Sequence, residues 1–186
     1  MLGAQLALML SLGVCGPGNS DQGVITGVVV NASQGGAPSP RADVVLRVQA
    51  EGEFLPVAST ASDEQGRFRF KDLPVGGEYV YLPGANWAEV HYPGVRLQLT
   101  EARSQAAVRL EVCDAVAHPS PLVIKRQEIL IKPETGVLRV TESLLIDNPT
   151  STTYVGRAEV KGAEPVTLQL GIPSDFERTT FHKEFF

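Results

Sequence analysis

The segment 59–79, STASDEQGRFRFKDLPVGGEY, constrains the fold more than any other part of this 186-residue chain. Residues 62–66 predict a turn, and residues 67–70 then alternate arginine with phenylalanine. Successive side chains of a strand point to opposite faces, so Phe68 and Phe70 are expected to enter one core. The segment therefore predicts one corner of a β-sandwich.

The ends of this corner carry their own signals. We expect Gly66 to close the turn with positive φ, where a residue with a Cβ costs about 1–2 kcal/mol. Asp63 is expected to accept backbone N–H bonds within the turn. Leu73 and Pro74 are expected to stop the strand, and Tyr79 is expected to restart the apolar pattern in the next one.

The rest of the first half also predicts strands. With 18 glycines and 13 prolines, the chain has enough turn-forming residues to connect the many short strands of an all-β protein. We expect seven or eight strands in about 90 residues, which is the spacing of a sandwich. Besides residues 67–70, the expected strands are 24–30, 44–48, 54–61, 79–82 (closed by Pro83-Gly84), 87–91, 95–99 and 106–112.

A linker and a second β-rich domain are expected after the sandwich. The linker is residues 114–121, because His118-Pro119-Ser120-Pro121 cannot continue a regular strand or helix. The second domain, residues 122–186, is expected to be incomplete, because it offers few strands for a closed sandwich. Those strands are 122–131, 137–146 (with Leu138, Val140, Leu144 and Ile146 on one face), 152–160 and 166–170.

The N-terminus predicts export. Residues 1–18 have an apolar stretch followed by small residues and a proline, as in a signal peptide. A buried N-terminal strand is the alternative. Leu12-Gly13-Val14-Cys15 is similar to the site where bacterial lipoproteins are acylated, although Val14 fits that site badly. Cys113 is expected to be a small buried hydrophobic residue, and its pairing with Cys15 would need both residues to be retained.

Residues 23–112 are similar to a known family, and the sandwich domain is expected to span residues 23–113. The stretches ITGVV (25–29), PRADV (40–44), SDEQGRFRF (62–70) and LPVGGEY (73–79) resemble the carboxypeptidase regulatory-like domain. The resemblance implies a transthyretin-like (prealbumin-like) β-sandwich that is the non-catalytic companion of an enzyme. Ser62 replaces the usual threonine, and the turn before Tyr79 has one extra residue, but neither change affects the expected fold.

Three aromatic residues suggest a ligand surface. Tyr81, Trp87 and Tyr92 flank a loop-rich segment, where exposed rings would offer flat faces to sugars. Packing of these rings in the core is the competing interpretation. Sandwiches related to this one include carbohydrate-binding modules, but that is an analogy of fold.

No catalytic, metal-binding or cofactor-binding motif stands out. The histidines His91, His118 and His182 lack the spacing of a metal-ligand set, and an acidic chain of formal charge −5 is a poor nucleic-acid binder. We therefore expect a non-catalytic exported module with a structural, adhesion or carbohydrate-binding role at the bacterial cell envelope, where polysaccharide or an envelope protein would be its partner.

Two enzyme-related alternatives remain. The chain could be an accessory domain of a hydrolase or peptidase whose catalytic part lies elsewhere. A transthyretin-related hydrolase of a cyclic ureide is disfavoured, because such enzymes end in a Tyr-Arg-Gly motif and this chain ends in Glu184-Phe185-Phe186.

Overall fold

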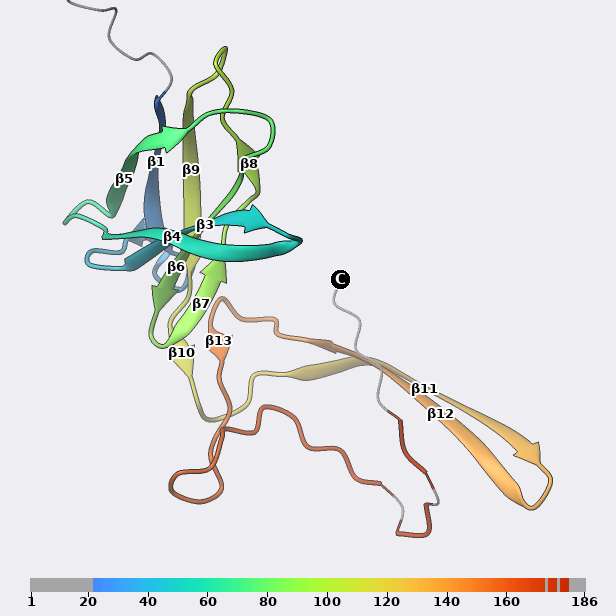
Figure 1. Ribbon diagram of the computed structural model, residues 1–186. Helices are drawn as coiled ribbons and strands as arrows, with labels where there is room; N and C mark the ends of the chain where they lie inside the picture. Colours follow the sequence, from blue (N-terminus) through green and yellow to red (C-terminus); the bar gives the residue numbers. More distant parts are fainter. Residues whose placement is uncertain (1–21, 173, 177, 181–186) are drawn as a thin grey trace, which may run out of the picture. The chain divides into compact units, whose positions relative to one another are not determined.

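The described part of the protein is all-β and divides into two compact units. A computed structural model describes residues 22–172, 174–176 and 178–180, which hold thirteen strands and one short 3₁₀ helix, Ala32–Gln34 (Figure 1). The leader predicted over residues 1–18, including Cys15, lies outside the described residues. The first unit takes in β1 up to Val30, Pro38–Asn86 and His91–Leu110; the second takes in Asn31–Ala37, Trp87–Val90 and the chain from Glu111.

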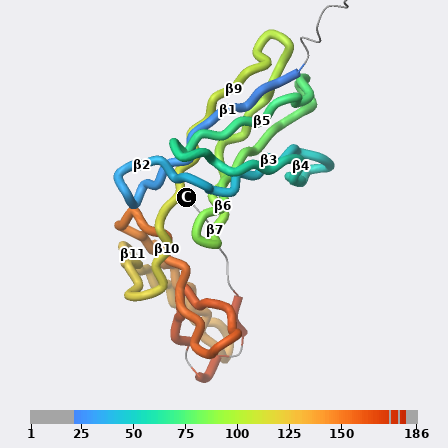
Figure 2. The backbone as a smooth tube through the Cα atoms, turned by 90° about the vertical axis from the view of Figure 1, so that its left-hand side faces the viewer, coloured from blue at the N-terminus to red at the C-terminus, as the bar shows by residue number. Residues whose placement is uncertain are grey.

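One sheet of the first unit is built around β1. This strand, Gln22–Asn31, pairs with β5, Arg67–Pro74, on one side, and the sheet runs in the order β2-β1-β5. The other two members are β2, Ala37–Pro38, and β9, Gln105–Val112, which also pairs with β1. Figures 1 and 2 both show β9, β1 and β5 side by side. The β-branched run in β1 suits this central position, where both edges of the strand are paired.

The second sheet runs in the order β4-β3-β6-β7, with β8 also paired to β6. Antiparallel pairing joins β3 to β4 over its whole length and to β6 over Asp43–Val48. The bounds of the strands are Asp43–Ala50 for β3, Glu53–Ala61 for β4, Val80–Trp87 for β6, Val90–Pro93 for β7 and Leu97–Gln98 for β8.

Both sheets contribute to one apolar interior. Phe68 and Phe70 are each 5% exposed, and their ring centroids lie 5.9 Å apart in an edge-to-face arrangement, so the prediction that both enter one core is confirmed. The hydroxyl of Tyr81 in β6 donates to the carbonyl of Pro74 in β5 at 2.8 Å and links the two sheets. Other buried members are Ile25, Val29, Val44, Leu46, Leu73, Ala85, Leu99 and Leu110.

The turn before β5 has the predicted geometry. Gly66 has a φ of 73°, and a Cβ there would collide with the carbonyl oxygen of Val29. Oδ1 of Asp63 accepts the backbone N–H groups of Gln65 at 2.9 Å and Arg67 at 2.8 Å, while Oδ2 accepts Nε of Arg67 at 2.9 Å. These bonds, led by the one from the Arg67 backbone, hold the pKa of Asp63 below its usual value of 3.8.

One of the two predicted strand stops is confirmed and the other is wrong. β5 ends at Pro74 as predicted, whereas β6 continues through Pro83-Gly84. Pro74 ends a strand that has β1 on one side only, where a missing N–H is tolerated. The carbonyl of Pro83 accepts the N–H of Gly94 at 2.8 Å. In an antiparallel sheet, the N–H and C=O of one residue point to the same neighbouring strand. The nitrogen of Pro83 therefore faces away from β3, and its missing N–H removes no hydrogen bond between β3 and β6.

The predicted strand at 87–91 is also wrong. Ala88 and Glu89, with φ of 48° and 64°, form a two-residue turn between β6 and β7. Positive φ at both central positions gives the twist that suits a tight hairpin. β7 therefore folds directly back along β6. The predicted strand at 95–99 is reduced to Leu97–Gln98, and the predicted start at Tyr79 moves to Val80.

The second unit contains a long hairpin and one short parallel pair. The hairpin joins β11, Val123–Glu134, to β12, Val137–Asp147, through the turn Thr135-Gly136. The parallel pair joins β10, Ala115–Val116, to β13, Thr153–Tyr154. The predicted linker 114–121 thus includes a short strand.

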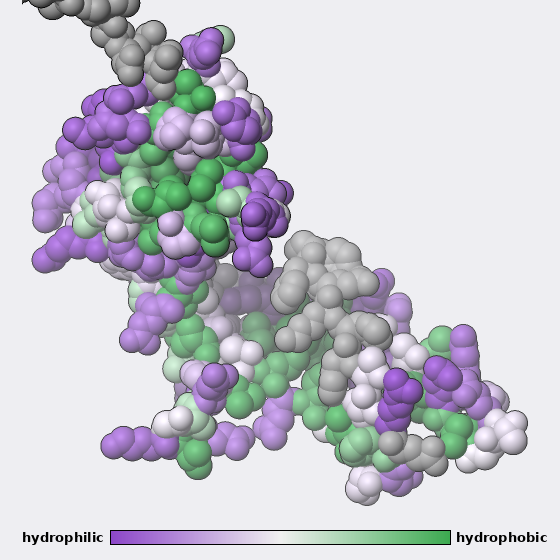
Figure 3. Space-filling view, viewed as in Figure 1, coloured by the Kyte–Doolittle hydropathy of each residue, from purple (hydrophilic) through white to green (hydrophobic). Residues whose placement is uncertain are grey.

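The other strands predicted for the second unit are largely absent from its described residues. Only Thr153–Tyr154 is a strand within 152–160, and 166–170 contributes a single bridge, from Val166 to Arg157. Leu138 and Val140 do share one face of the hairpin, but they are 66% and 57% exposed. Figure 3 shows such apolar side chains in green among polar ones over the hairpin. The alternating pattern of residues 166–170 did not by itself produce a strand.

Candidate functional site

A chain of polar side chains lies on the outer face of the second sheet. Val44 and Leu46 of β3 point inward and are fully buried, so Asp43 and Arg47 point outward. In β6, Asn86 lies opposite Asp43 in the register with β3. The tight β6–β7 turn returns the chain and adds His91 to the same face.

The hydrogen bonds of this polar chain have a defined direction. Nη1 of Arg47 lies 2.8 Å from Nε2 of His91, and Nδ1 of His91 lies 2.7 Å from Oδ1 of Asn86. Nδ2 of Asn86 donates to Oδ2 of Asp43 at 2.7 Å. A guanidinium can only donate, so Nε2 accepts and the imidazole carries its proton on Nδ1, which donates to Asn86. The neutral imidazole satisfies both contacts.

A glycine makes room for the imidazole. A Cβ on Gly84 would lie 2.6 Å from Cε1 and 2.9 Å from Nε2 of His91, so the ring rests on the bare backbone of β6. Partial burial there and the charge of Arg47 lower the pKa of His91 below its usual 6.5. The site therefore offers a neutral imidazole between an amide and a guanidinium, with the carboxylate of Asp43 at the end.

Of the predicted ligand-binding aromatics, Tyr81 is a core residue. It is 2% exposed, and burial, together with the neighbouring Tyr79, raises the pKa of its phenol. Tyr92 is half-buried in the first unit, and Trp87 is half-buried in the second. The described structure thus does not bring the three rings together on one exposed face. A ligand role for Trp87 or Tyr92 remains a prediction.

Trp87 belongs to a polar cluster of the second unit centred on Asp114. Nδ2 of Asn31 donates to Oδ1 of Asp114 at 2.6 Å, and Nε2 of Gln34 lies 3.2 Å from Oδ2. These bonds, with a further one from the Trp87 side chain, keep the pKa of Asp114 low. The hydroxyl of Ser33 accepts the N–H of Asp114 at 2.8 Å. This cluster fastens the segment Asn31–Ala37, which is a structural role.

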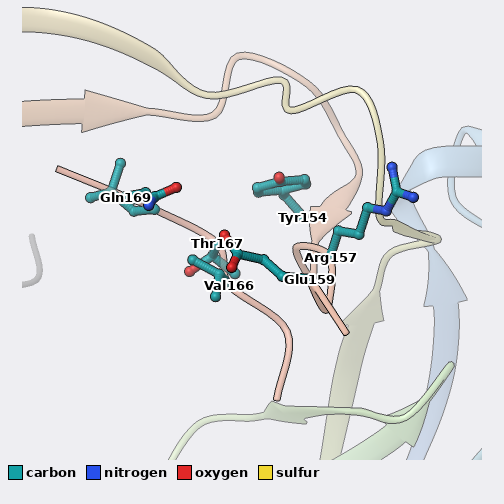
Figure 4. Close-up of a pocket in the computed structure, with 7 residues that line it drawn as sticks. Tyr154, Arg157, Glu159, Val166, Thr167 and Gln169 are labelled. Carbon is teal, nitrogen blue, oxygen red and sulfur yellow. The ribbon is translucent and has the colours of Figure 1, made fainter. Parts of the chain in front are cut away.

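An open hollow lies elsewhere in the second unit. Its volume is about 450 Å³, and Figure 4 shows that residues on both sides of the Arg157–Val166 bridge line it. Tyr154, Arg157 and Glu159 come from one side, and Val166–Gln169 from the other. The charges in this hollow have both signs, from Arg157 and Glu159.

The described residues contain no group of three His, Cys, Asp or Glu side chains placed to hold a metal ion. Cys113 is half-buried. No helix in the described ranges has the length and apolar character that crossing a bilayer requires.

The comparisons with known proteins identify the first half of the chain. Residues 24–111 match the family described as the carboxypeptidase regulatory-like domain. This segment is a carboxypeptidase regulatory-like domain. It contains both sheets of the sandwich, the Asp63 turn and all four residues of the polar chain. No curated protein sequence matches the chain closely enough to be counted as a relative.

Several solved structures resemble the chain weakly. They include BcpA, the major pilin subunit of Bacillus cereus (18% identity, 49% of this chain and 29% of the pilin, TM-score 0.35). An (S)-allantoin synthase gives 18% identity, 50% of this chain, 41% of the synthase and a TM-score of 0.39. A proposed carbohydrate binding protein from Pseudomonas aeruginosa gives 19% identity, 50% of this chain, 89% of that protein and a TM-score of 0.31. The chain thus spans less than a third of the pilin and less than half of the synthase. TM-scores this low support no role for the regulatory-like domain.

Sequence reasoning missed the polar chain of the regulatory-like domain. The alternation in β3 already places Asp43 and Arg47 on one face. Their meeting with His91 depends on the register of three strands and on the turn at Ala88-Glu89. The available signal was a histidine two residues after a tight-turn candidate, which is too common to single out a site.

Proposed function

We propose that the protein is an exported, non-catalytic module that binds polysaccharide of the cell envelope through the outer face of the β4-β3-β6-β7 sheet. The observation that supports this role is the polar chain from Arg47 through His91 and Asn86 to Asp43. Its planar groups are already oriented by one another, so a ligand would not have to immobilise each of them separately. Such preorganisation reduces the entropic cost of binding.

The chemistry of these groups suits sugar hydroxyls. A hydroxyl both donates and accepts, and the polar chain contains a guanidinium donor, a carboxylate acceptor and an amide with both functions. The half-buried Val45 and Leu82 lie on the same outer face and offer apolar surface beside the polar groups. A site of this kind, with a few placed polar groups on an apolar ground, is typical of specific recognition.

Binding to purified cell-wall polysaccharides, supplemented by a glycan array, tests the proposal. Asn86→Ala and His91→Ala should each weaken binding about tenfold or more, since one well-placed polar contact contributes roughly 1.5 kcal/mol. Arg69→Ala, on an exposed position of the other sheet, should leave it unchanged. If all three variants bind as the wild type does, the polar chain is not the binding site. If binding is lost only in a fourth variant, Trp87→Ala, the ligand binds at the aromatic residue instead.

Export is part of the proposal and has its own test. The apolar stretch within residues 1–18 supports it. Expression of the full chain in a bacterial host, followed by fractionation, should place a shortened product outside the cytoplasm. A membrane-bound product that becomes soluble in Cys15→Ser would show lipid anchoring. A product of full length in the cytoplasm would reject export.

An accessory role beside a hydrolase is the second candidate, and the family of residues 24–111 favours it. The test is the addition of the purified chain to a peptidase encoded next to its gene. A change in the activity of that enzyme, with no polysaccharide binding by the chain alone, would favour this role.

A further inference from the structure

The outer edge of β11 is an unpaired strand edge. Within the described residues, β11 pairs only with β12, and all twelve of its residues are exposed. An isolated two-stranded ribbon is at best marginally stable in water, whereas three or more strands with an apolar face can be stable. The free edge also presents backbone N–H and C=O groups to any strand that can pair with them.

One face of the ribbon is mostly apolar, with Gln127 and Glu142 as its polar members, and the other is mostly charged, with Leu130 among the charges. Cross-strand partners share a face, and the register pairs Ile131 with Val140 and Pro133 with Leu138. Ile129 and Ile131 are 57% and 56% exposed on this apolar face. The opposite face carries the charged residues Arg126, Glu128, Lys132, Glu134 and Arg139, among which Arg139 and Glu134 form an ion pair at 2.6 Å.

The charges of β11 are antisymmetric about Leu130. Two residues before it stands Glu128 and two residues after it stands Lys132; four residues before it stands Arg126 and four residues after it stands Glu134. An antiparallel second copy centred on Leu130 would therefore place Glu128 opposite Lys132 and Arg126 opposite Glu134. Each of these opposite-charge pairs would occur twice.

We infer that two copies of this chain associate through β11, antiparallel and with a two-fold axis at Leu130, to form a sheet in the order β12-β11-β11-β12. The occupant of the free edge is thus the same strand of a second copy. Its self-complementary charges select this partner, because opposite charges across a strand pair stabilise it and like charges destabilise it.

The unpaired backbone N–H and C=O groups of β11 fit this register. The two-residue turn makes Glu134–Val137 the closing hydrogen-bonded pair of the hairpin, and alternate residues of β11 then bond to β12. Gln127, Ile129 and Ile131 accordingly direct their N–H and C=O groups to the free edge. In the proposed dimer, Ile129 exchanges two bonds with Ile131 of the second copy. Pro133 has no N–H, so one bond is lost opposite each Gln127.

The neighbouring registers are disfavoured. Sliding one strand by two residues in one direction places Arg126 opposite Lys132, and sliding it in the other places Glu128 opposite Glu134. Both shifts replace attraction by repulsion in two symmetry-related pairs. The proposed register is therefore specified by charge, and it leaves the isoleucines of both copies adjacent on one apolar face.

A charge swap tests the partner and its register. In the full chain, Lys132→Glu should raise the dimer dissociation constant about tenfold or more in sedimentation equilibrium, because it faces Glu128 of the second copy. Within its own ribbon the same change places a carboxylate opposite Arg139, so an unstable hairpin cannot explain the loss. Adding Glu128→Lys should restore the dimer. A wild-type chain that stays monomeric, or a double variant as weak as the single one, would overturn the inference.

Cysteine cross-linking tests the two-fold axis directly. In a Cys15→Ser/Cys113→Ala chain, Leu130→Cys should form a disulfide between copies, because directly opposed residues lie within disulfide reach. Gln127→Cys is the matched control, since the two copies of this residue would lie about 20 Å apart along the strands. Equal cross-linking of the two variants would mean that the copies meet in another way.

Discussion

At the scale of single residues, the position and the neutral state of His91 depend on two neighbours, Gly84 and Arg47. Gly84 has no side chain beneath the ring, and Arg47 has no acceptor, so the imidazole fits closely and stays neutral. Its low pKa follows from partial burial and the adjacent positive charge. A lone histidine in an exposed strand would show neither effect.

We predict that His91 titrates below pH 6.5 in an NMR experiment, and that Arg47→Met raises its pKa towards that value by removing the positive charge. Since the native pKa is lowered, the stability linked to His91 is present above pH 6.5 and decreases as the pH falls through the native pKa. Arg69→Met is the control and should not alter the titration. A pKa of 6.5 or above in the wild type would contradict the hydrogen-bond directions given for the polar chain.

Gly66 gives a second prediction at the residue scale. Gly66→Ala should destabilise the fold by about 1–2 kcal/mol from its positive φ alone. The collision of the new Cβ with the Val29 carbonyl should add to this cost. Chemical denaturation measures the loss. Gly52→Ala is the control, because Gly52 has a φ of 90° but a Cβ there would meet nothing within 4 Å. An equal loss of stability in both variants would show that the collision with the Val29 carbonyl contributes nothing.

At the scale of elements, alternation predicted strands well wherever one face is buried. The predicted strands 24–30, 44–48, 67–70 and 106–112 are present as β1, β3, β5 and β9, whose buried apolar side chains a one-residue slip would expose. The stop predicted at Pro83 is wrong, since whether this proline ends a strand depends on which neighbour its missing N–H faces. The segment 166–170 alternates as clearly as β3, but its described residues find no neighbouring strand. The alternating pattern predicts which side chains share a face, but a strand forms only where a neighbouring strand pairs with the segment.

The core contribution of β5 is a prediction at this scale. Phe68→Ala should lower the free energy of unfolding by about 3–5 kcal/mol, because it leaves a cavity beside Phe70. Leu55→Ala in β4, where the side chain is 48% exposed, should change stability by roughly 0.5 kcal/mol or less. Urea denaturation of both variants measures the difference. Equal losses would show that Phe68 does not anchor the sandwich.

At the scale of the whole molecule, three exposed or half-buried carboxylates are expected to make the stability depend on pH in the acid range. Asp63, Asp114 and Glu134 all have lowered pKa values, because hydrogen bonds from Arg67, Asn31 and Arg139, respectively, favour their charged forms. Their contribution is present above the ordinary values of 3.8 and 4.5 and is lost as the pH falls through the native ones.

We therefore predict that the melting temperature falls as the pH is lowered below about 4.5. Asp63→Asn should melt lower at neutral pH and lose less on acidification, since it has no charge left to neutralise. Thermal melts at a series of pH values measure both effects. Parallel curves for the variant and the wild type would contradict a native role for the Asp63 carboxylate.

The fold of the regulatory-like domain could be predicted from its sequence, but the candidate site could not. Of the aromatic residues singled out by their type, Tyr81 lies in the core. The residues of the polar chain are brought together from three strands, and only their register shows it. Local pattern identifies what a residue can do, whereas its partners depend on pairing at long range.

The hairpin turn at Ala88-Glu89 has one more implication, which concerns evolution and engineering. Surface loops normally tolerate insertions. Here, one extra residue would turn each side chain of β7 to the opposite face of the sheet. The imidazole of His91 would then point into the apolar core of the sandwich. Loop-length variation, tag insertion and circular permutation should therefore succeed at the exposed Glu51-Gly52 turn and fail at this one.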